Sequence, residues 1–201
     1  IKSMAKLRIV TPKGAGLAGN YDLENEALAP IDAEIVEAPA DEAGFVAAAR
    51  NADAIYAQGI RLTKPIIDAL EACKVISLPS VGVDSVDVKA ASARGIPVTN
   101  VPDTFIEEVA DHAMALLLAG FRRVIEQDKM VREGRWSEGR PALLKIPRLA
   151  GQTLGFVSFG RVARAVAKRA APFGLRMMAY DPFIEEMLIS DHGVLPATLS
   201  E

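Results

Sequence analysis

Short apolar runs alternate with segments of helical spacing along the first hundred residues. Strands are predicted where these runs fall, at residues 6–12, 33–39, 53–59, 74–80 and 96–102. Helices are predicted at residues 42–52, 63–73 and 84–95, with Thr63 and Pro65 as start signals for the second. A Gly-rich loop, residues 14–19, follows the first strand. This alternation predicts an α/β fold with a parallel sheet covered by helices on both faces.

The next apolar pattern predicts one long helix that begins at Pro102. Thr104 and Glu107 match the S/T-x-x-E capping box, in which each side chain bonds a free backbone amide. Apolar residues recur every four positions, and three more widen the apolar face: Phe105, Val109, Ala113, Leu117 and Phe121, with Met114, Leu116 and Leu118. We expect such a helix to be buried on two sides, between domains or subunits. A Pro/Gly/basic connector follows at residues 137–151, and a boundary near residue 101 gives domains 4–101 and 102–201.

Composition excludes several classes of protein. The 201 residues carry a net charge of −3 without a concentration of Lys and Arg, so no nucleic-acid surface is expected. There is no apolar run long enough to span a membrane and no secretory signal, which favours a cytoplasmic protein. The single cysteine, Cys73, lies in an apolar context typical of a buried small residue, and no Cys/His cluster has metal-ligand spacing.

Residues 154–169, LGFVSFGRVARAVAKR, resemble a strand, a tight turn and a helix. Ser158, Gly160 and Ala163 occupy the three positions of the dinucleotide-binding pattern G-x-G-x-x-G. Gly160 permits close approach of a pyrophosphate to the helix N-terminus, and Ala163 still permits helix–strand packing. Ser158 departs from the pattern, and a Cβ there costs on the order of 1 kcal/mol if the backbone needs positive φ. Its hydroxyl could instead bond a backbone group or a phosphate oxygen.

Asp181 ends the next apolar run, LRMMAYDP, 21 positions after Gly160. The dinucleotide-binding pattern has an acid about 20 residues on, where a carboxylate accepts hydrogen bonds from the ribose hydroxyls. A carboxylate there also repels a 2′-phosphate, so NAD is favoured over NADP. The alternative is an ordinary βαβ unit in which Asp181 caps the Tyr-Asp-Pro turn.

Residues 80–123 and 149–182 together resemble the D-isomer-specific 2-hydroxyacid dehydrogenase family, in its phosphoglycerate dehydrogenase and C-terminal-binding-protein-like branch. The resemblance implies an α/β protein with a flavodoxin-like substrate domain and the start of a Rossmann-type doubly wound parallel-sheet domain. In this family the nucleotide-binding domain is inserted in the substrate domain, and the C-terminus returns to complete the latter. We therefore expect the 201 residues to be part of a longer protein, with a half-sheet that exposes apolar faces and an open edge.

The resemblance also assigns site residues. A V-G-x-D loop holds the substrate carboxylate on backbone amides, matched here by Val81, Gly82 and Val83, followed by Asp84. The alternative is a tight turn with Gly82 present for its conformation and Asp84 as an N-cap. The cofactor contacts match Val109, Ser158, Phe159, Gly160, Arg161, Val162 and Asp181, although Arg161 could equally be a solvated first-turn residue.

Family catalysis uses an Arg, a Glu and a His that lie downstream of the Tyr-Asp-Pro turn, so no catalytic residue is assigned within this chain. We expect His112 to be a packed or interdomain-bonded histidine and His192 to be a surface turn residue. The implied function is NAD-dependent hydride transfer between nicotinamide and C2 of a small D-2-hydroxy or 2-oxo acid, in a homodimer. Two alternatives stay open: an NAD(H)-sensing corepressor-like interaction protein, and a remnant that no longer binds the cofactor.

Overall fold

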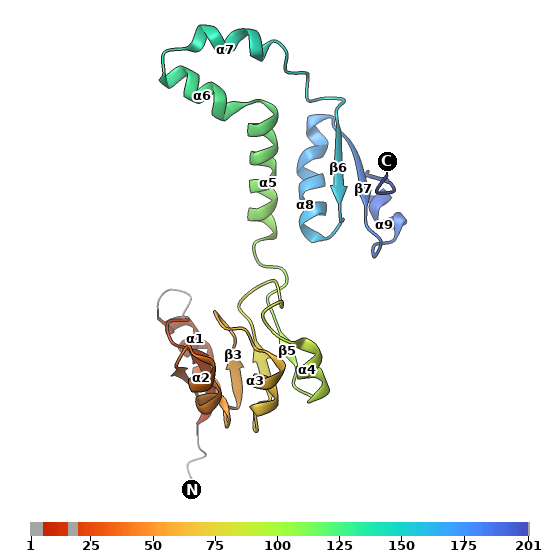
Figure 1. Ribbon diagram of the computed structural model, residues 1–201. Helices are drawn as coiled ribbons and strands as arrows, with labels where there is room; N and C mark the ends of the chain where they lie inside the picture. The colour runs from red at the N-terminus through yellow and green to blue at the C-terminus, as the bar shows by residue number, and fades with distance from the viewer. Residues whose placement is uncertain (1–5, 16–19, 201) are drawn as a thin grey trace. The chain divides into compact units, whose positions relative to one another are not determined.

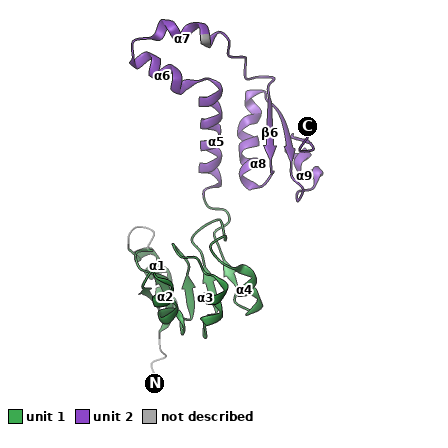
Figure 2. Cartoon of the chain, in the orientation of Figure 1, with its two compact units in different colours: residues 1–104 green, residues 105–201 purple. Residues whose placement is uncertain are grey.

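The computed structural model describes residues 6–15 and 20–200, so residues 16–19 of the predicted Gly-rich loop lie outside it. The chain divides into two compact units, residues 1–104 and 105–201, which are coloured separately in Figure 2. Each unit has its own sheet and its own apolar core, and each is described by itself.

Unit 1 is built on a five-stranded parallel sheet (Figure 1). Its strand order is β2-β1-β3-β4-β5, which is the flavodoxin-like order, so the predicted fold class is confirmed. All five predicted strands are present in shorter form: β1 (Leu7–Pro12), β2 (Ala33–Ala38), β3 (Ala54–Tyr56), β4 (Val75–Ser77) and β5 (Val98–Thr99).

Helices α2 (Glu42–Ala49), α3 (Lys64–Ala69) and α4 (Val88–Ala93) supply the apolar side chains that pack on one face of this sheet. The core there joins alternate strand residues such as Ile55 and Ile76 to Phe45 and Ile67 from the helices. Thr63 precedes α3 with Pro65 in the first turn, as predicted, although its side chain makes no capping bond.

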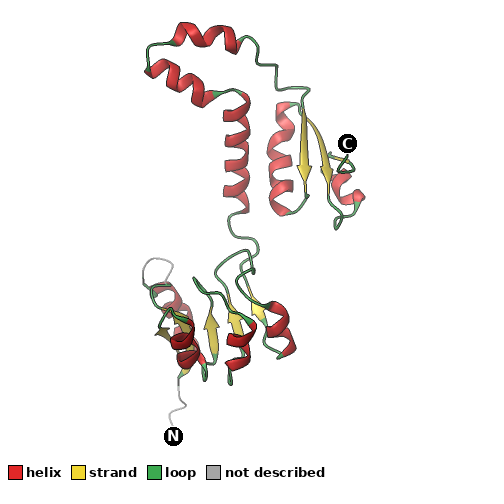
Figure 3. Ribbon diagram, viewed as in Figure 1, coloured by secondary structure: helices red, strands yellow, loops and turns green. Residues whose placement is uncertain are grey.

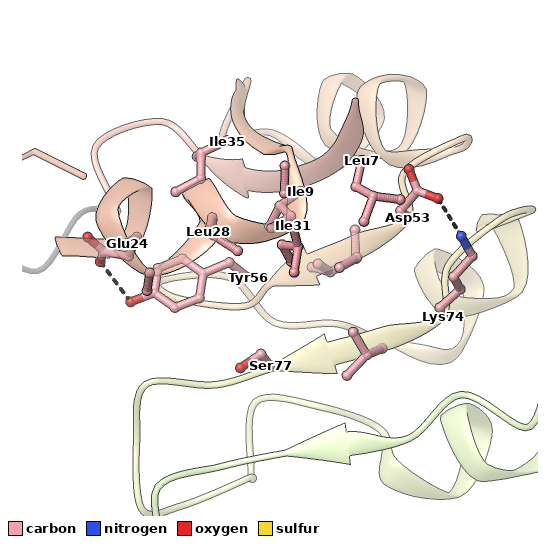
Figure 4. A pocket seen from close by; sticks show the side chains of 15 residues that line it. Leu7, Ile9, Glu24, Leu28, Ile31, Ile35, Asp53, Tyr56, Lys74 and Ser77 are labelled. Atoms are coloured by element: carbon pink, nitrogen blue, oxygen red, sulfur yellow. Dashed lines mark hydrogen bonds and ion pairs between the residues drawn. The ribbon is translucent and has the colours of Figure 1, made fainter. Parts of the chain in front are cut away.

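The other face of the sheet is hollowed and apolar (Figure 4). Helix α1 (Asp22–Leu28) and the 3₁₀ turn η1 (Ala29–Ile31) border a hollow of about 420 Å³. Its charged groups are paired at the rim, where the Tyr56 hydroxyl bonds Glu24 at 3.2 Å and Lys74 bonds Asp53 at 2.8 Å. Parallel sheets are normally covered on both faces, whereas this face carries an apolar hollow.

Unit 2 holds a three-stranded parallel sheet in the order β6-β7-β8, with helices alongside it (Figure 3). The elements are β6 (Thr153–Val157), α8 (Arg161–Ala170), η2 (Ala171–Phe173), β7 (Arg176–Tyr180), α9 (Glu186–Asp191) and β8 (Leu195–Pro196). Among the described residues β6 has a strand partner on one side only. Val157 at its end is 77% exposed, so the expected open edge and apolar exposure are both found.

The predicted single long helix is wrong. The structure has α5 (Ile106–Phe121), α6 (Val124–Arg132) and α7 (Trp136–Leu143) instead, and α7 replaces half of the predicted connector. The chain breaks after α5 because Arg123 adopts a left-handed conformation, with φ of 53°. The capping box is wrong as well: the N-cap residue of α5 is Phe105, with φ of 66°, and it makes no side-chain capping bond.

Helix α5 buries one side within unit 2, through Ala110 and Met114. Leu116 on the same helix is 61% exposed, so the predicted burial on two sides is not found within this unit. Helices α6 and α7 form a hairpin that extends from the end of α5 (Figure 1). Among the described residues, none of the helices has both the length and the hydropathy needed for a membrane span.

Candidate functional site

The glycine turn, residues 158–160, joins β6 to α8 as predicted. Ser158 has φ of 83°, so the serine does occupy a backbone conformation that favours glycine. Its amide donates to the Tyr180 carbonyl at 2.7 Å, which ties the turn to the end of β7. The neighbouring end of β7 leads directly into Asp181.

Asp181 lies beside the glycine turn and accepts hydrogen bonds on both carboxylate oxygens. Its Oδ2 accepts from the Phe159 amide at 2.7 Å and from the Ser158 hydroxyl at 3.3 Å. Its Oδ1 accepts from the Phe183 amide at 2.9 Å, which caps the turn that follows. Asp181 therefore does cap the turn, as the alternative predicted, and it also binds the glycine turn.

These bonds stabilise the charged form of the carboxyl group. The Phe159 amide, then the Phe183 amide, hold the pKa of Asp181 below its ordinary value, and the Ser158 hydroxyl adds to them against partial desolvation. Asp181 is therefore a fixed negative charge at neutral pH.

Gly160 precedes α8 and leaves the helix N-terminus open. A Cβ added at Gly160 would meet nothing within 4 Å, and Gly160, as the N-cap residue, has no side chain to cap the helix. The first-turn amides of α8, such as those of Val162 and Ala163, have no carbonyl partner within the helix. Together with the helix dipole they suit an anionic group such as a pyrophosphate.

Other predicted cofactor residues have different surroundings. The Phe159 ring is fully buried and packs edge-on against Phe156, with ring centroids 5.7 Å apart. Val162 packs against the same core, whereas Arg161 is exposed at the start of α8. Val109 on α5 is 49% exposed.

An ion-pair cluster between α8 and α5 was not predicted. The Arg169 guanidinium bonds Asp111 at 2.5 Å and Glu107 at 2.6 Å, and the Arg169 side chain is only 24% exposed. The sequence placed Glu107 in a capping box, but its carboxylate pairs with a helix 62 residues away along the chain. These ion pairs join α8, the helix that follows the glycine turn, to α5.

The predicted substrate loop, residues 81–83, follows β4 in unit 1. Its three carbonyl groups are all engaged: Asn100 donates to Val81, Ser80 to Gly82, and the Val86 amide to Val83, at 2.7, 2.8 and 2.9 Å. The three amide groups of the loop have no acceptor among the described residues. The loop therefore presents backbone donors while its own carbonyl groups are already bonded, which suits a carboxylate.

Both parts of the alternative for this loop are wrong. Gly82 lies outside the left-handed region, so its conformation does not require glycine. A Cβ at Gly82 would instead approach the Asp84 carboxylate to 3.1 Å. The N-cap of α4 is Asp87, whose side chain accepts from the Ala90 amide at 2.9 Å.

Ser80 and Asn100 hold the loop, and neither was assigned that role from the sequence. Asn100 follows β5, the strand beside β4, so the parallel pairing brings its amide to the loop. The adjacency of β4 and β5 in an α/β fold was the signal that could have found it.

The remaining candidates show no catalytic arrangement. His112 is exposed on α5, so within unit 2 it is not the packed histidine that was expected. His192 does end a helix at the surface, where its ring lies edge-on to Phe159 with centroids 5.6 Å apart. Cys73 is half-buried, and burial raises the pKa of its thiol. Within residues 6–15 and 20–200, no cluster of three or more His, Cys, Asp or Glu residues could hold a metal ion.

Comparison with known proteins identifies the family. A family model described as the catalytic domain of D-isomer specific 2-hydroxyacid dehydrogenases matches residues 3–190. A glyoxylate reductase of Korarchaeum cryptofilum is 39% identical over 163 residues, which cover 79% of this chain and 48% of that protein. The chain therefore belongs to the D-isomer specific 2-hydroxyacid dehydrogenase family, and it spans about half the length of this relative.

Solved structures share the fold. A D-lactate dehydrogenase from Aquifex aeolicus, solved with NAD and lactic acid, matches with a TM-score of 0.77 at 24% identity, over 96% of this chain and 56% of that one. An acyclic imino acid reductase solved with NADPH and D-Arg matches with a TM-score of 0.79 at 20% identity, over 94% of this chain and 60% of that one. At these identities the likeness supports the α/β architecture.

Proposed function

We propose that the protein is an NAD-dependent oxidoreductase that transfers a hydride between nicotinamide and C2 of a small D-2-hydroxy or 2-oxo acid. The observation that carries this proposal is the substrate loop. Its carbonyl groups are already bonded while its amide groups, within the described part of the chain, are free to donate, and free backbone amides suit a carboxylate ligand. Membership of the family supplies the reaction class. The relative from Korarchaeum cryptofilum is a glyoxylate reductase, and glyoxylate is a small 2-oxo acid, so its name agrees with the proposed substrate class.

The residues of unit 2 fit a dinucleotide. The open helix N-terminus behind Gly160 would take the pyrophosphate, and Asp181 would accept hydrogen bonds from the adenosine ribose hydroxyls. When bound, the nicotinamide supplies or accepts the hydride. The chain's own part is to bind both partners in order and to orient the substrate through its carboxylate.

We propose NAD rather than NADP because Asp181 is a fixed negative charge. The solved neighbours hold NAD in one case and NADPH in another, so the choice depends on this chain's own residues. A 2′-phosphate beside Asp181 would place two anions in contact, whereas ribose hydroxyls would donate to it.

No catalytic acid is assigned among these 201 residues. The proton that accompanies the hydride is assigned to the downstream His that the resemblance implies, and neither His112 nor His192 takes that role. Oxidation of NADH with a panel of glyoxylate, hydroxypyruvate and phenylpyruvate, using the protein as its gene encodes it, tests the reaction class. Turnover with at least one 2-oxo acid is expected.

We also propose that the protein is a homodimer formed through α5 and the α6–α7 hairpin. This region exposes large apolar side chains at the surface of unit 2, notably Leu116 (61%), Ile125 (74%), Val131 (54%) and Trp136 (54%). Exposed apolar surface of this extent, interspersed with charges of both signs, is typical of an interface. Dimerisation tightened by NADH with negligible turnover would instead support the NAD(H)-sensing alternative.

A further inference from the structure

The serine at the first glycine position is held in a conformation that serine rarely adopts. Ser158 has φ of 83°, and its amide is bonded to the end of β7. A glycine would adopt this conformation without strain. A side-chain contact made by Ser158 can offset the strain of this backbone conformation, and the structure contains one.

That contact is the hydrogen bond from the Ser158 hydroxyl to Asp181 Oδ2. The Phe159 amide donates to the same oxygen, and the Phe183 amide donates to the other one. The carboxylate is therefore held from both sides, and the serine supplies the one donor that a glycine would lack. At 3.3 Å the hydroxyl bond is long, so we expect it to make only a modest contribution to the orientation of the Asp181 carboxylate.

We propose that Ser158 is a positioning residue for Asp181, and that it strengthens the preference of the site for an unphosphorylated adenosine ribose. This inference deepens the proposed function and rests on it. A carboxylate that is held in place faces the ribose with a fixed charge, whereas one that can rotate away tolerates a 2′-phosphate. The donors around the carboxylate are all uncharged: the amides of Phe159, Phe183 and Ile184 and the hydroxyl of Ser158.

Dissociation constants for NADH and NADPH, measured with the protein as its gene encodes it, test the inference. Ser158→Ala keeps the Cβ and loses the hydroxyl, whereas Ser158→Gly loses both. We expect both variants to lower the NADPH-to-NADH ratio of dissociation constants about threefold to fivefold, while only Ser158→Gly relieves the backbone. Ser190→Ala, which removes an exposed hydroxyl from α9, is the control and is expected to leave the ratio unchanged.

The Asp181→Asn background shows whether the hydroxyl acts through the carboxylate. In this background Ser158→Ala is expected to leave the NADPH-to-NADH ratio of dissociation constants unchanged, since the side chain at position 181 no longer carries a charge. An unchanged ratio in both Ser158→Ala and Ser158→Gly would overturn the inference, and so would an equal effect with and without the Asp181 charge.

A measurement without cofactor separates this inference from the proposed function. Carboxyl carbon chemical shifts report the titration of Asp181, and Ser158→Ala and Ser158→Gly are both expected to raise its pKa, because the hydroxyl that helps to hold it below its ordinary value is lost. Failure of the unsubstituted protein to bind either nucleotide would contradict the proposed function. An Asp181 titration unchanged by both substitutions would contradict the positioning role.

Discussion

At the scale of single residues, backbone strain at Ser158 gives a stability prediction. Its φ of 83° is unfavourable for any side chain, so Ser158→Gly is expected to raise the free energy of unfolding by about 0.5–1 kcal/mol. Ser158→Ala keeps the strain and loses the bond to Asp181, so it is expected to lower stability slightly. Urea denaturation followed by circular dichroism measures both. A Ser158→Gly protein less stable than Ser158→Ala would contradict the strain argument.

The lowered pKa of Asp181 gives a pH prediction at the same scale. The folded state binds this proton less tightly than the unfolded state, where the pKa is about 3.9. The resulting stabilisation is present at neutral pH and is lost as the pH falls through the lowered pKa of the folded state. Asp181→Asn should therefore remove part of the acid sensitivity, measured as urea midpoints between neutral and acid pH.

Asp191→Asn, which removes a carboxylate at the end of α9, is the matched control for this pH prediction. It is expected to leave the acid branch of the stability profile in place. An unchanged acid branch in Asp181→Asn would show that the bonds to the Phe159 and Phe183 amides do not stabilise the folded chain.

The substrate loop gives a third residue-scale prediction. Asn100→Ala removes the donor to the Val81 carbonyl, so that carbonyl becomes a free acceptor beside the amides that are proposed to bind the substrate carboxylate. A free acceptor repels a carboxylate, so KM for a 2-oxo acid is expected to rise about tenfold with a smaller change in kcat, corresponding to about 1.4 kcal/mol. Steady-state kinetics of the protein as its gene encodes it measures this, and a fall in kcat alone would contradict it.

At the scale of elements, the Arg169 cluster controls how α5 packs on α8. Arg169→Met is expected to lower the stability of unit 2 slightly, since two exposed carboxylates lose their partner. Lys168→Met, at the exposed neighbouring position, is the control and is expected to be near neutral. Because the carboxylates are exposed, the difference between the two variants should shrink as salt is raised, in urea titrations at low and high ionic strength.

Periodicity predicted the five strands of the first sheet and strands β6 and β7 of the second, because buried parallel strands are short apolar runs bounded by turns. It failed at α5 because helical spacing continues through Arg122 and Arg123, and only the left-handed backbone at Arg123 ends the helix. The capping box failed because a tertiary contact, Glu107 to Arg169, uses the glutamate that the local motif required. Helix α9 and strand β8 have weak local patterns and were not predicted.

The site was predicted unevenly for a similar reason. Residues within the glycine turn are close in sequence, and Asp181 follows at a known spacing, so both were found. Asn100 bonds the Val81 carbonyl only once β4 and β5 lie side by side, so strand pairing and not a local motif brings it to the loop. Ser80 bonds the Gly82 carbonyl two residues on, a local contact that a serine side chain makes in only one of several turn conformations. The hydroxyl of Ser158 was expected to bond a backbone group or a phosphate, but its partner is the Asp181 carboxylate.

At the scale of the whole molecule, the apolar hollow of unit 1 needs a cover. The family resemblance implies that residues outside this sequence complete the substrate domain, and we propose that such residues fill the hollow shown in Figure 4. Ile31, which lines the hollow and is 57% exposed, tests this. Ile31→Asp is expected to be near neutral in the 201-residue chain and to cost about 2 kcal/mol in the protein as its gene encodes it. Equal effects in the two proteins would contradict the proposal.

The proposed dimer is tested on the same scale. Ile125→Asp places a charge in the exposed apolar surface of α6 and is expected to convert the dimer to a monomer, measured by sedimentation equilibrium. Met187→Asp changes an equally exposed side chain on α9 and is the control, expected to leave the mass unchanged. A dimer that survives Ile125→Asp would place the interface elsewhere.

The central claim is that a carboxylate-binding loop in unit 1 and a dinucleotide turn in unit 2 serve one reaction of the D-2-hydroxyacid dehydrogenase family. The most direct measurement is the loss of NADH absorbance when the protein, as its gene encodes it, meets glyoxylate, hydroxypyruvate or phenylpyruvate. We predict oxidation of NADH with at least one of these acids, slower oxidation of NADPH, and formation of the D-hydroxy acid. Absence of NADH oxidation with every 2-oxo acid in the panel would contradict it.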